Sequence, residues 1–280
     1  MIAYRDMSFS DIDAGLSLCR AAGWNQLARD WELFLKLSPK GCRVALSDNK
    51  VVGTVTTLRY QNSFSWIGMV LVDPAHRKKG IGLKLLHEAL QILKEEETVR
   101  LDATADGRKV YLKLNFVDEY PLSRMIAVIN KEKLSPVNVE PVRKKDIPRI
   151  AEFDLGIFGA DRKVLLRWLY EGAPQHAFIV KENDKVQGYC LARNGFNHIH
   201  IGPVVASNMH VAKDLVTAAL QNCIGQQVII DILHFNKNWI AWLAELGFTT
   251  QRTFTRMHRG PYNSKSITGK QYAITGPEFG

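Results

Sequence analysis

The chain has 280 residues, of which 46% are hydrophobic and 23% are charged, and its formal net charge is +9 at pH 7. These values are typical of a globular protein with one large domain or two ordinary ones, and no apolar run approaches the roughly 18 residues of a membrane-spanning helix. The excess positive charge would attract a polyanion, either a nucleic acid or a nucleotide cofactor with several phosphates.

The four cysteines are scattered and form no Cys-x-x-Cys pair, and no targeting segment is visible. We therefore expect reduced thiols, no metal site and a cytoplasmic location, with no membrane partner. The basic clusters are short and contain no interleaved aromatic residues, so a nucleic-acid partner is not expected either. The oligomeric state stays open.

The first half of the chain begins with two amphipathic stretches and continues with apolar ones. Hydrophobic periodicity distinguishes the helices from the strands. In chain order it predicts helices over 11–22 and 27–37, strands over 43–46, 51–58 and 65–72, a helix over 81–93, a strand over 99–103, a helix over 107–114 and a strand that ends at 130.

A basic turn with two glycines joins the strand at 65–72 to the helix that begins at Ile81. It contains Asp73-Pro74 and then His76-Arg77-Lys78-Lys79-Gly80-Ile81-Gly82. A helix N-terminus offers free backbone N–H groups and a positive dipole end, and glycines let the chain approach a ligand closely. This turn therefore predicts a binding site for a phosphorylated ligand.

Short segments recur at an offset of about 134 residues. Trp66-Ile67-Gly68 resembles His200-Ile201-Gly202, and Leu114-Asn115-Phe116 resembles Leu246-Gly247-Phe248. A repeat of this length indicates a duplicated domain. Further matches are Gly53 with Gly188 and Arg124-Met125 with Arg256-Met257.

The second half repeats the same order of elements, so we expect an α+β fold with two tandem domains, over 1–133 and 138–280. Each would contain a mixed, mostly antiparallel sheet flanked by helices. Pro136 places the boundary within Leu134–Asn138. The predicted elements are helices over 146–153 and 162–170, strands over 177–181, 186–192 and 198–205, a helix over 211–223, a strand over 228–233, a helix over 238–246 and a strand over 253–259.

The turn Arg77-Lys78-Lys79-Gly80-Ile81-Gly82 resembles the Arg/Gln-x-x-Gly-x-Gly/Ala signature of the GNAT superfamily of acyl-CoA-dependent N-acyltransferases. The segment from Tyr111 to Phe116 is similar to the Tyr-x-x-x-Gly-Phe segment of that family, with Asn115 in place of the glycine. The resemblance covers roughly residues 1–130. The second half resembles the same fold with its cofactor signature lost, and the whole layout is similar to two-domain GNAT proteins.

This resemblance implies how acetyl-CoA would bind. The pantetheine arm would pair with the strand that carries Val70, Leu71 and Val72, and the pyrophosphate would bind at the turn. Tyr111 would protonate the departing thiolate, and an amide of the same strand would stabilise the oxyanion. The implied turn residues are Arg77, Lys78, Lys79, Gly80, Ile81, Gly82 and Leu83.

The acceptor side is less defined. The strand at 65–72 contains no carboxylate before Asp73, so the family's glutamate base is absent there, and Thr104 replaces an asparagine that contacts the cofactor in many relatives. Trp24, Asn25 and Asp30 lie in the region that usually forms the acceptor pocket and could receive a cationic amine. The candidates for the base are Asp102, Glu119, His76 and Asp30.

The second half is not expected to hold a second active site. The offset maps Val211–Asp214 onto Arg77–Gly80 and Leu243 onto Tyr111, and no glycine occurs between Pro203 and Gly225. We therefore predict that the second half forms a wall of the acceptor pocket and buries a face of the first domain. The alternative is a packing role alone.

The predicted function is transfer of an acetyl group from acetyl-CoA to a primary amine of a small-molecule or amino-acid-like acceptor. The alternative is an acyl-CoA-binding sensor or structural subunit without turnover.

Overall fold

The computed structural model describes residues 1–60, 63–261 and 265–280. Every helix and strand predicted for the first half is present, and the edge strand β1 is an addition. The elements are β1 (Ile2–Asp6), α1 (Ile12–Ala21), α2 (Ala28–Leu37), β2 (Arg43–Ser47), β3 (Lys50–Tyr60), β4 (Phe64–Val72), α3 (Ile81–Ile92), β5 (Val99–Ala103), α4 (Ala105–Leu112) and β6 (Val117–Val128).

The second half also contains its predicted elements, together with two short strands that periodicity did not indicate, β7 and β13. Its elements are β7 (Glu140–Pro141), α5 (Ile147–Phe158), α6 (Lys163–Gly172), β8 (Phe178–Glu182), β9 (Lys185–Arg193), β10 (Ile199–Ala206), α7 (Met209–Gln221), β11 (Gln227–Leu233), α8 (Lys237–Glu245), β12 (Thr249–Arg259) and β13 (Gln271–Ala273).

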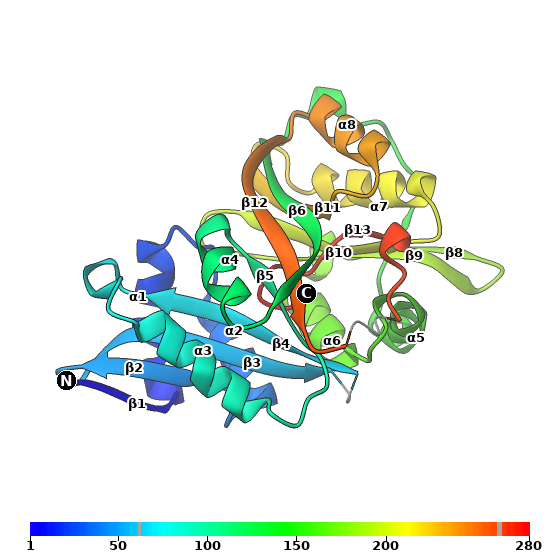
Figure 1. The fold of residues 1–280 in the computed structure, drawn as a ribbon. Helices are drawn as coiled ribbons and strands as arrows, with labels where there is room; N and C mark the ends of the chain where they lie inside the picture. Colours follow the sequence, from blue (N-terminus) through cyan, green and yellow to red (C-terminus); the bar gives the residue numbers. More distant parts are fainter. Residues whose placement is uncertain (61–62, 262–264) are drawn as a thin grey trace.

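One mixed sheet runs through the molecule, which confirms the α+β fold (Figure 1). The strand order is β1-β2-β3-β4-β5-β12-β6-β11-β10-β9-β8-β7, and β13 pairs with β10. The two halves therefore exchange a strand: β12 lies between β5 and β6, and β6 lies between β12 and β11. The domain boundary at 134–138 stays a prediction, and the sheet contains strands from both sides of it.

Strands β4 and β5 separate after a short parallel contact. They pair only at Ser65 with Val99 and at Trp66 with Arg100, although β4 continues to Val72. The β3–β4 register also shifts opposite this region, and Met69 has φ 51°. Such a bulge leaves backbone groups of β4 without sheet partners. The C-terminal ends of β4 and β5 thus form an opening between α3 and α4.

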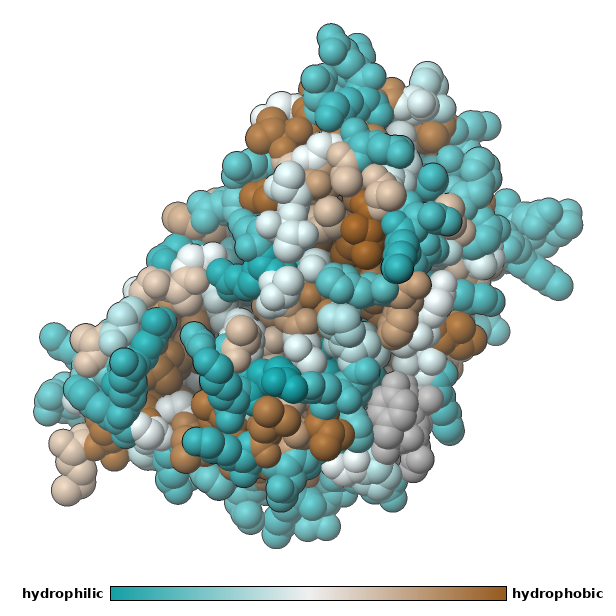
Figure 2. Space-filling view, turned by 45° about the horizontal axis from the view of Figure 1, so that its top comes forward, coloured by the Kyte–Doolittle hydropathy of each residue, from teal (hydrophilic) through white to brown (hydrophobic). Residues whose placement is uncertain are grey.

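The described residues contain no helix that is long and apolar enough to cross a membrane. On the face shown in Figure 2, hydrophobic residues form small separate groups between hydrophilic ones. The four cysteines are buried and unpaired, as expected for reduced thiols.

Candidate functional site

An outer groove of about 510 Å³ lies at the C-terminal end of β4, between α3 and α4. The structure brings most residues of the predicted cofactor site to this groove. Leu71 and Lys79 are the exceptions: Leu71 is buried on the opposite face of β4, because side chains alternate along a strand, and Lys79 is exposed beside the groove. The predicted cofactor residues that line the groove are Val70, Val72, Arg77, Lys78, Gly80, Ile81, Gly82 and Leu83. The other lining residues are His76, Leu86, Thr104, Asp106, Gly107, Val110 and Tyr111.

The N-terminus of α3 is open toward this groove. Gly80 precedes the helix with φ 77°, and no side chain of the described residues caps it. Asp73 instead accepts a hydrogen bond from Ala75 N at 2.7 Å, within the turn that precedes the helix. Arg77 Nε donates to the Val72 carbonyl at 3.2 Å and so fixes the turn to the end of β4. Free amides and the helix dipole therefore make this end of α3 suited to a phosphate group.

Tyr111 lies on α4 at the inner end of the groove. Thr104 caps this helix by accepting from Gly107 N at 3.2 Å, and the Tyr111 ring packs on Phe116 with ring centres 5.9 Å apart. The Tyr111 hydroxyl has no hydrogen-bond partner in the part of the chain that the structure describes. Burial raises the pKa of Tyr111 to about 12, so the hydroxyl keeps its proton at neutral pH.

A smaller inner pocket of about 80 Å³ adjoins the outer groove. The two share Val70, Thr104 and Tyr111. Both halves of the chain form the inner pocket, because the strand exchange brings β12 beside β5 and β6. It is lined by Trp24, Gln26, Ile67, Gly68, Met69, Val70, Asp102, Thr104, Tyr111, Arg124, Arg252, Phe254, Pro277 and Glu278.

Of the three residues predicted to bind an acceptor, Trp24 lines the inner pocket. Asn25 and Asp30 do not line it. The Asn25 side-chain oxygen accepts from the backbone of Asn197 and His198 at 2.9 and 3.0 Å, which joins the two halves. Asp30 caps α2 through Leu27 N at 2.6 Å and forms an ion pair with Arg193. Gln26, beside Asn25, lines the pocket instead.

Three of the four predicted candidates for the general base, Asp30, Asp102 and Glu119, form ion pairs with arginines. Asp102 lines the inner pocket, but Arg256 donates to both of its oxygens at 2.8 and 2.9 Å. Glu119 is held by Arg100, and His76 lies 3.6 Å from Asp73 at the rim of the outer groove.

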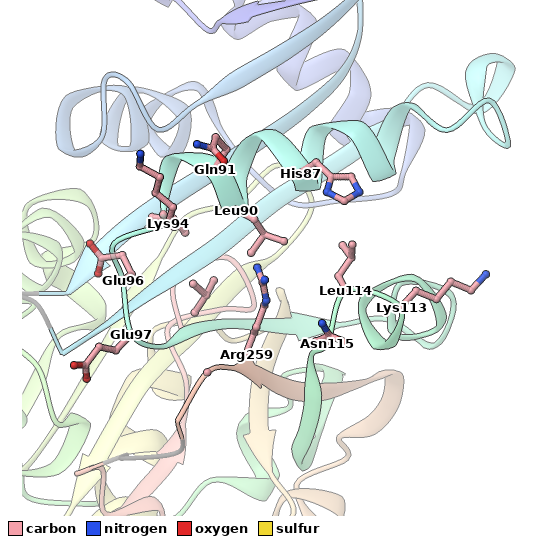
Figure 3. A pocket seen from close by; sticks show the side chains of 13 residues that line it. His87, Leu90, Gln91, Lys94, Glu96, Glu97, Lys113, Leu114, Asn115 and Arg259 are labelled. Atoms are coloured by element: carbon pink, nitrogen blue, oxygen red, sulfur yellow. The ribbon is translucent and has the colours of Figure 1, made fainter.

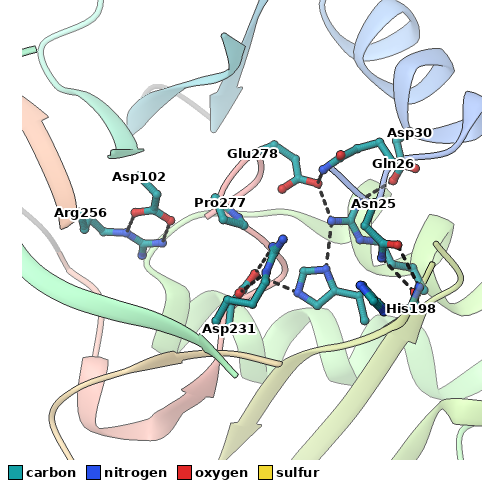
Figure 4. Close-up of polar contacts among 12 residues, drawn as sticks. Asn25, Gln26, Asp30, Asp102, His198, Asp231, Arg256, Pro277 and Glu278 are labelled. Atoms are coloured by element: carbon teal, nitrogen blue, oxygen red, sulfur yellow. Dashed lines mark hydrogen bonds and ion pairs between the residues drawn. The ribbon is translucent and has the colours of Figure 1, made fainter. Parts of the chain in front are cut away.

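Glu278 is a pocket residue that sequence reasoning missed (Figure 4). Glu278 lies over β4, directly above Gly68. A Cβ added to Gly68 would come within 2.8 Å of the Glu278 carbonyl oxygen and 3.2 Å of the Glu278 Cβ. Glu278 Oε1 accepts from Gln26 Nε2 at 2.8 Å and also from Arg193. The C-terminal segment thus supplies a carboxylate to a strand that has none of its own. The sequence offered one signal for this contact, the glycine that occurs in both halves as Gly68 and Gly202. Gly202 makes room for the Ile274 carbonyl as Gly68 does for that of Glu278.

A buried polar chain connects Glu278 to β6. Arg193 Nη2 donates to His200 Nδ1 at 3.2 Å, and His200 Nε2 lies 3.0 Å from Asp231. Asp231 accepts two bonds from Arg124, at 2.8 and 2.7 Å. Burial lowers the pKa of His200, and this effect is larger than the opposite effect of the Asp231 carboxylate. His200 is therefore uncharged at neutral pH.

The described part of the second half has no counterpart of the phosphate-binding turn. Residues 73–80 connect β4 to α3, but only Ser207 and Asn208 connect β10 to α7. The offset that maps Val211–Asp214 onto Arg77–Gly80 is therefore wrong at this point, because the connection is shorter, and Asn208 takes the place of Gly80. Its side chain accepts from Val211 N at 3.1 Å, so it occupies the helix end that stays open in α3.

In the second half, the space between β10 and β11 corresponds to the opening between β4 and β5, and it is filled. Strand β13 pairs with β10, and Trp239 Nε1 donates to the Tyr272 carbonyl at 3.0 Å. Leu243 takes the position of Tyr111: Phe248 N donates to its carbonyl at 3.0 Å, as Phe116 N does to that of Tyr111 at 3.1 Å.

A third groove, of about 630 Å³, lies at the other end of α3 (Figure 3). His87, Lys94 and Arg259 are among its lining residues, and it shares none with the outer groove or the inner pocket. It therefore contains none of the residues predicted for the site.

Comparison with known proteins gives matches over both halves. A model described as Acetyltransferase (GNAT) family matches residues 15–116, and one described as Acetyltransferase (GNAT) domain matches residues 150–273. The chain is 29% identical over 255 residues to the Holothin acyltransferase of Pseudoalteromonas sp. (strain SANK 73390), covering 91% of this chain and 85% of that protein.

Solved structures share the fold over nearly the whole chain. A putative acetyltransferase from Pyrococcus horikoshii superposes with a TM-score of 0.81 at 24% identity, covering 100% of this chain and 96% of that one. A tandem GNAT protein from the clavulanic acid biosynthesis pathway superposes with a TM-score of 0.64 at 14% identity, covering 94% and 100%. At these identities the likeness concerns the fold alone.

Proposed function

The chain belongs to the GNAT superfamily and is an acyl-CoA-dependent acyltransferase, and from this premise we propose that it transfers an acetyl group from acetyl-CoA to the primary amine of a small-molecule or amino-acid-like acceptor. One observation carries the proposal: the outer groove and the inner pocket meet at Val70, Thr104 and Tyr111. A thioester in the groove and an amine in the pocket would meet at that junction.

The outer groove would hold the coenzyme. Its diphosphate would bind the open N-terminus of α3, with Arg77 and Lys78 adding charge-assisted contacts. The pantetheine arm would lie along the unpaired part of β4. A backbone N–H near the bulge at Met69 would donate to the oxyanion that forms when the thioester is attacked.

In the reaction a neutral amine would attack the thioester carbon. A C–N bond forms, the C–S bond breaks, the amine nitrogen loses a proton to water, and the thiolate leaves. Tyr111 would donate its hydroxyl proton in a hydrogen bond to this sulfur. Its pKa of about 12 against ~8.5 for a thiol makes a complete transfer uphill by roughly 5 kcal/mol. The expected role of Tyr111 is therefore to stabilise the developing thiolate, which water then protonates.

The test is release of free coenzyme A from acetyl-CoA in the presence of a panel of primary amines. Amine-dependent thiol release, with one N-acetylated product per thiol, is expected. Binding of acetyl-CoA without amine-dependent release across the panel would instead favour a sensor or structural subunit. We also propose a cytoplasmic location, as expected from the four unpaired cysteines.

A further inference from the structure

Two arginines face each other across strands in the wall of the inner pocket. The β12–β6 register shifts between Thr250 and Arg252, and the shift places Arg252 directly opposite Arg124. Both residues line the pocket. Like charges directly opposite in a sheet are unfavourable, so this pair needs an anion nearby.

Only one of these two charges is neutralised. Arg124 forms two hydrogen bonds to Asp231. Arg252 is half-buried, and among the described residues it has no ion pair or hydrogen bond. Burial and the neighbouring Arg124 lower the pKa of Arg252, and this outweighs the opposite effect of Asp231, which Arg124 already binds. One positive charge on the pocket wall is therefore uncompensated.

The opposite charge lies at Glu278, which also lines the inner pocket. Within the part of the chain that the structure describes, Arg193 is the one cation at ion-pair distance from Glu278 and from Asp30, so two carboxylates share a single guanidinium. His200 contributes no charge at neutral pH because burial lowers its pKa. Gln26 and Arg193 both donate to Oε1 of Glu278, which leaves Oε2 without a partner among the described residues.

We propose that the inner pocket binds an acceptor that carries a carboxylate as well as the amine, with the carboxylate on Arg252 and the amine on Glu278. The proposal rests on the proposed function and names the class of its acceptor. A guanidinium binds a carboxylate in a bidentate manner, which fixes its orientation as well as its charge. The pocket volume of about 80 Å³ favours a small, amino-acid-sized molecule.

The experiment compares matched acceptors on wild-type enzyme and variants. Each common α-amino acid is tested with its carboxamide and its decarboxylated amine, by thiol release from acetyl-CoA. We expect amino acids to be preferred, and Arg252→Gln to lower kcat/KM for them about 10- to 100-fold, mostly through KM, with little change for the amides. Arg252→Lys should restore part of the loss. The matched control is Arg259→Gln, a half-buried arginine on the same strand that lines the third groove, and it should leave every ratio unchanged.

The outcomes separate this proposal from the proposed function. If neutral amides are acetylated as well as amino acids, or if Arg252→Gln leaves their ratio unchanged, the acceptor class is wrong while the acyltransferase function stands. If no amine supports thiol release, the proposed function fails. The class of molecule that the inner pocket binds is then decided by calorimetric titration of the same amino acids and amides into the protein saturated with coenzyme A. Tighter binding of amino acids, weakened by Arg252→Gln, supports the carboxylate site, and equal binding overturns it.

Discussion

Arg256 of β12 donates two hydrogen bonds to Asp102 of β5, and this buried ion pair fastens the last long strand of the second half into the sheet of the first. The same arrangement occurs with the halves reversed, because Arg124 of β6 donates to Asp231 of β11. The repeated Arg-Met pair in the sequence therefore marks a reciprocal exchange of strands. This exchange also brings Arg252 and Phe254 into the inner pocket.

Replacing Arg256 with Met should destabilise the fold strongly. The change leaves the Asp102 carboxylate buried without a partner, which typically costs about 3–5 kcal/mol. Urea unfolding measures the loss. The control is Arg108→Ala, which breaks an exposed pair with Asp118 and should cost less than about 1 kcal/mol. Equal losses for the two variants would mean that the Arg256–Asp102 pair does not hold the exchanged strand.

Replacing Tyr111 with Phe should lower kcat about 10- to 100-fold and leave KM for acetyl-CoA nearly unchanged. The ring contact with Phe116 is kept and only the hydroxyl is lost, which is the group expected to stabilise the thiolate. Because the pKa of Tyr111 is raised to about 12, the wild-type rate should show no loss from tyrosine ionisation up to about pH 10. Steady-state rates from pH 7 to 10 measure both effects, and a full rate for the Phe variant would remove Tyr111 from the mechanism.

Gly80→Glu should weaken acetyl-CoA binding far more than Lys78→Ala. The first change puts a side chain and a negative charge at the open end of α3, where φ is 77°, whereas the second removes one exposed cation and leaves the backbone donors in place. Gly156→Glu is the matched control: it makes the same change at an exposed position of α5, where an added Cβ meets nothing within 4 Å, and it should leave binding unchanged. Direct measurement of the dissociation constants gives the order, and the reverse order would mean that side chains rather than amides bind the phosphates.

His200 should make stability depend on pH in mildly acidic solution. Its folded-state pKa lies below the ordinary value of 6.5 because the ring is buried, so the unfolded chain takes up the proton first. Its contribution is complete above pH 6.5 and is lost as pH falls below that value. The free energy of unfolding, measured from pH 8 to 5, should fall less steeply in His200→Gln than in wild type. Parallel curves would show that His200 is not the group responsible.

Local sequence patterns predicted much of the fold and one side of the site. Periodicity located the helices and long strands, and the glycine turn located the outer groove. Asn115 departs from the family's glycine, yet it has φ 61°, and Asn accepts this left-handed conformation more readily than most residues. Strand alternation could also have shown that Leu71 faces away from the groove.

The rest of the site depends on contacts between distant parts of the chain. Glu278 reaches Gly68 only because the C-terminal segment passes over β4, and Arg252 reaches the pocket only because β12 crosses into the other half. The repeated glycine and the repeated Arg-Met pair are the sequence traces of these two events, and neither says which distant residues meet. Asn25 was predicted in place of its neighbour Gln26 because composition identified the right loop but not the direction of each side chain.

The most direct test of the central claim is a calorimetric titration of the protein with acetyl-CoA. The open end of α3 and the filled, capped end of α7 predict one molecule bound per chain, with binding abolished by Gly80→Glu and unchanged by Asn208→Ala. Two molecules per chain, or binding that survives Gly80→Glu, would contradict the assignment of the coenzyme to the first half alone.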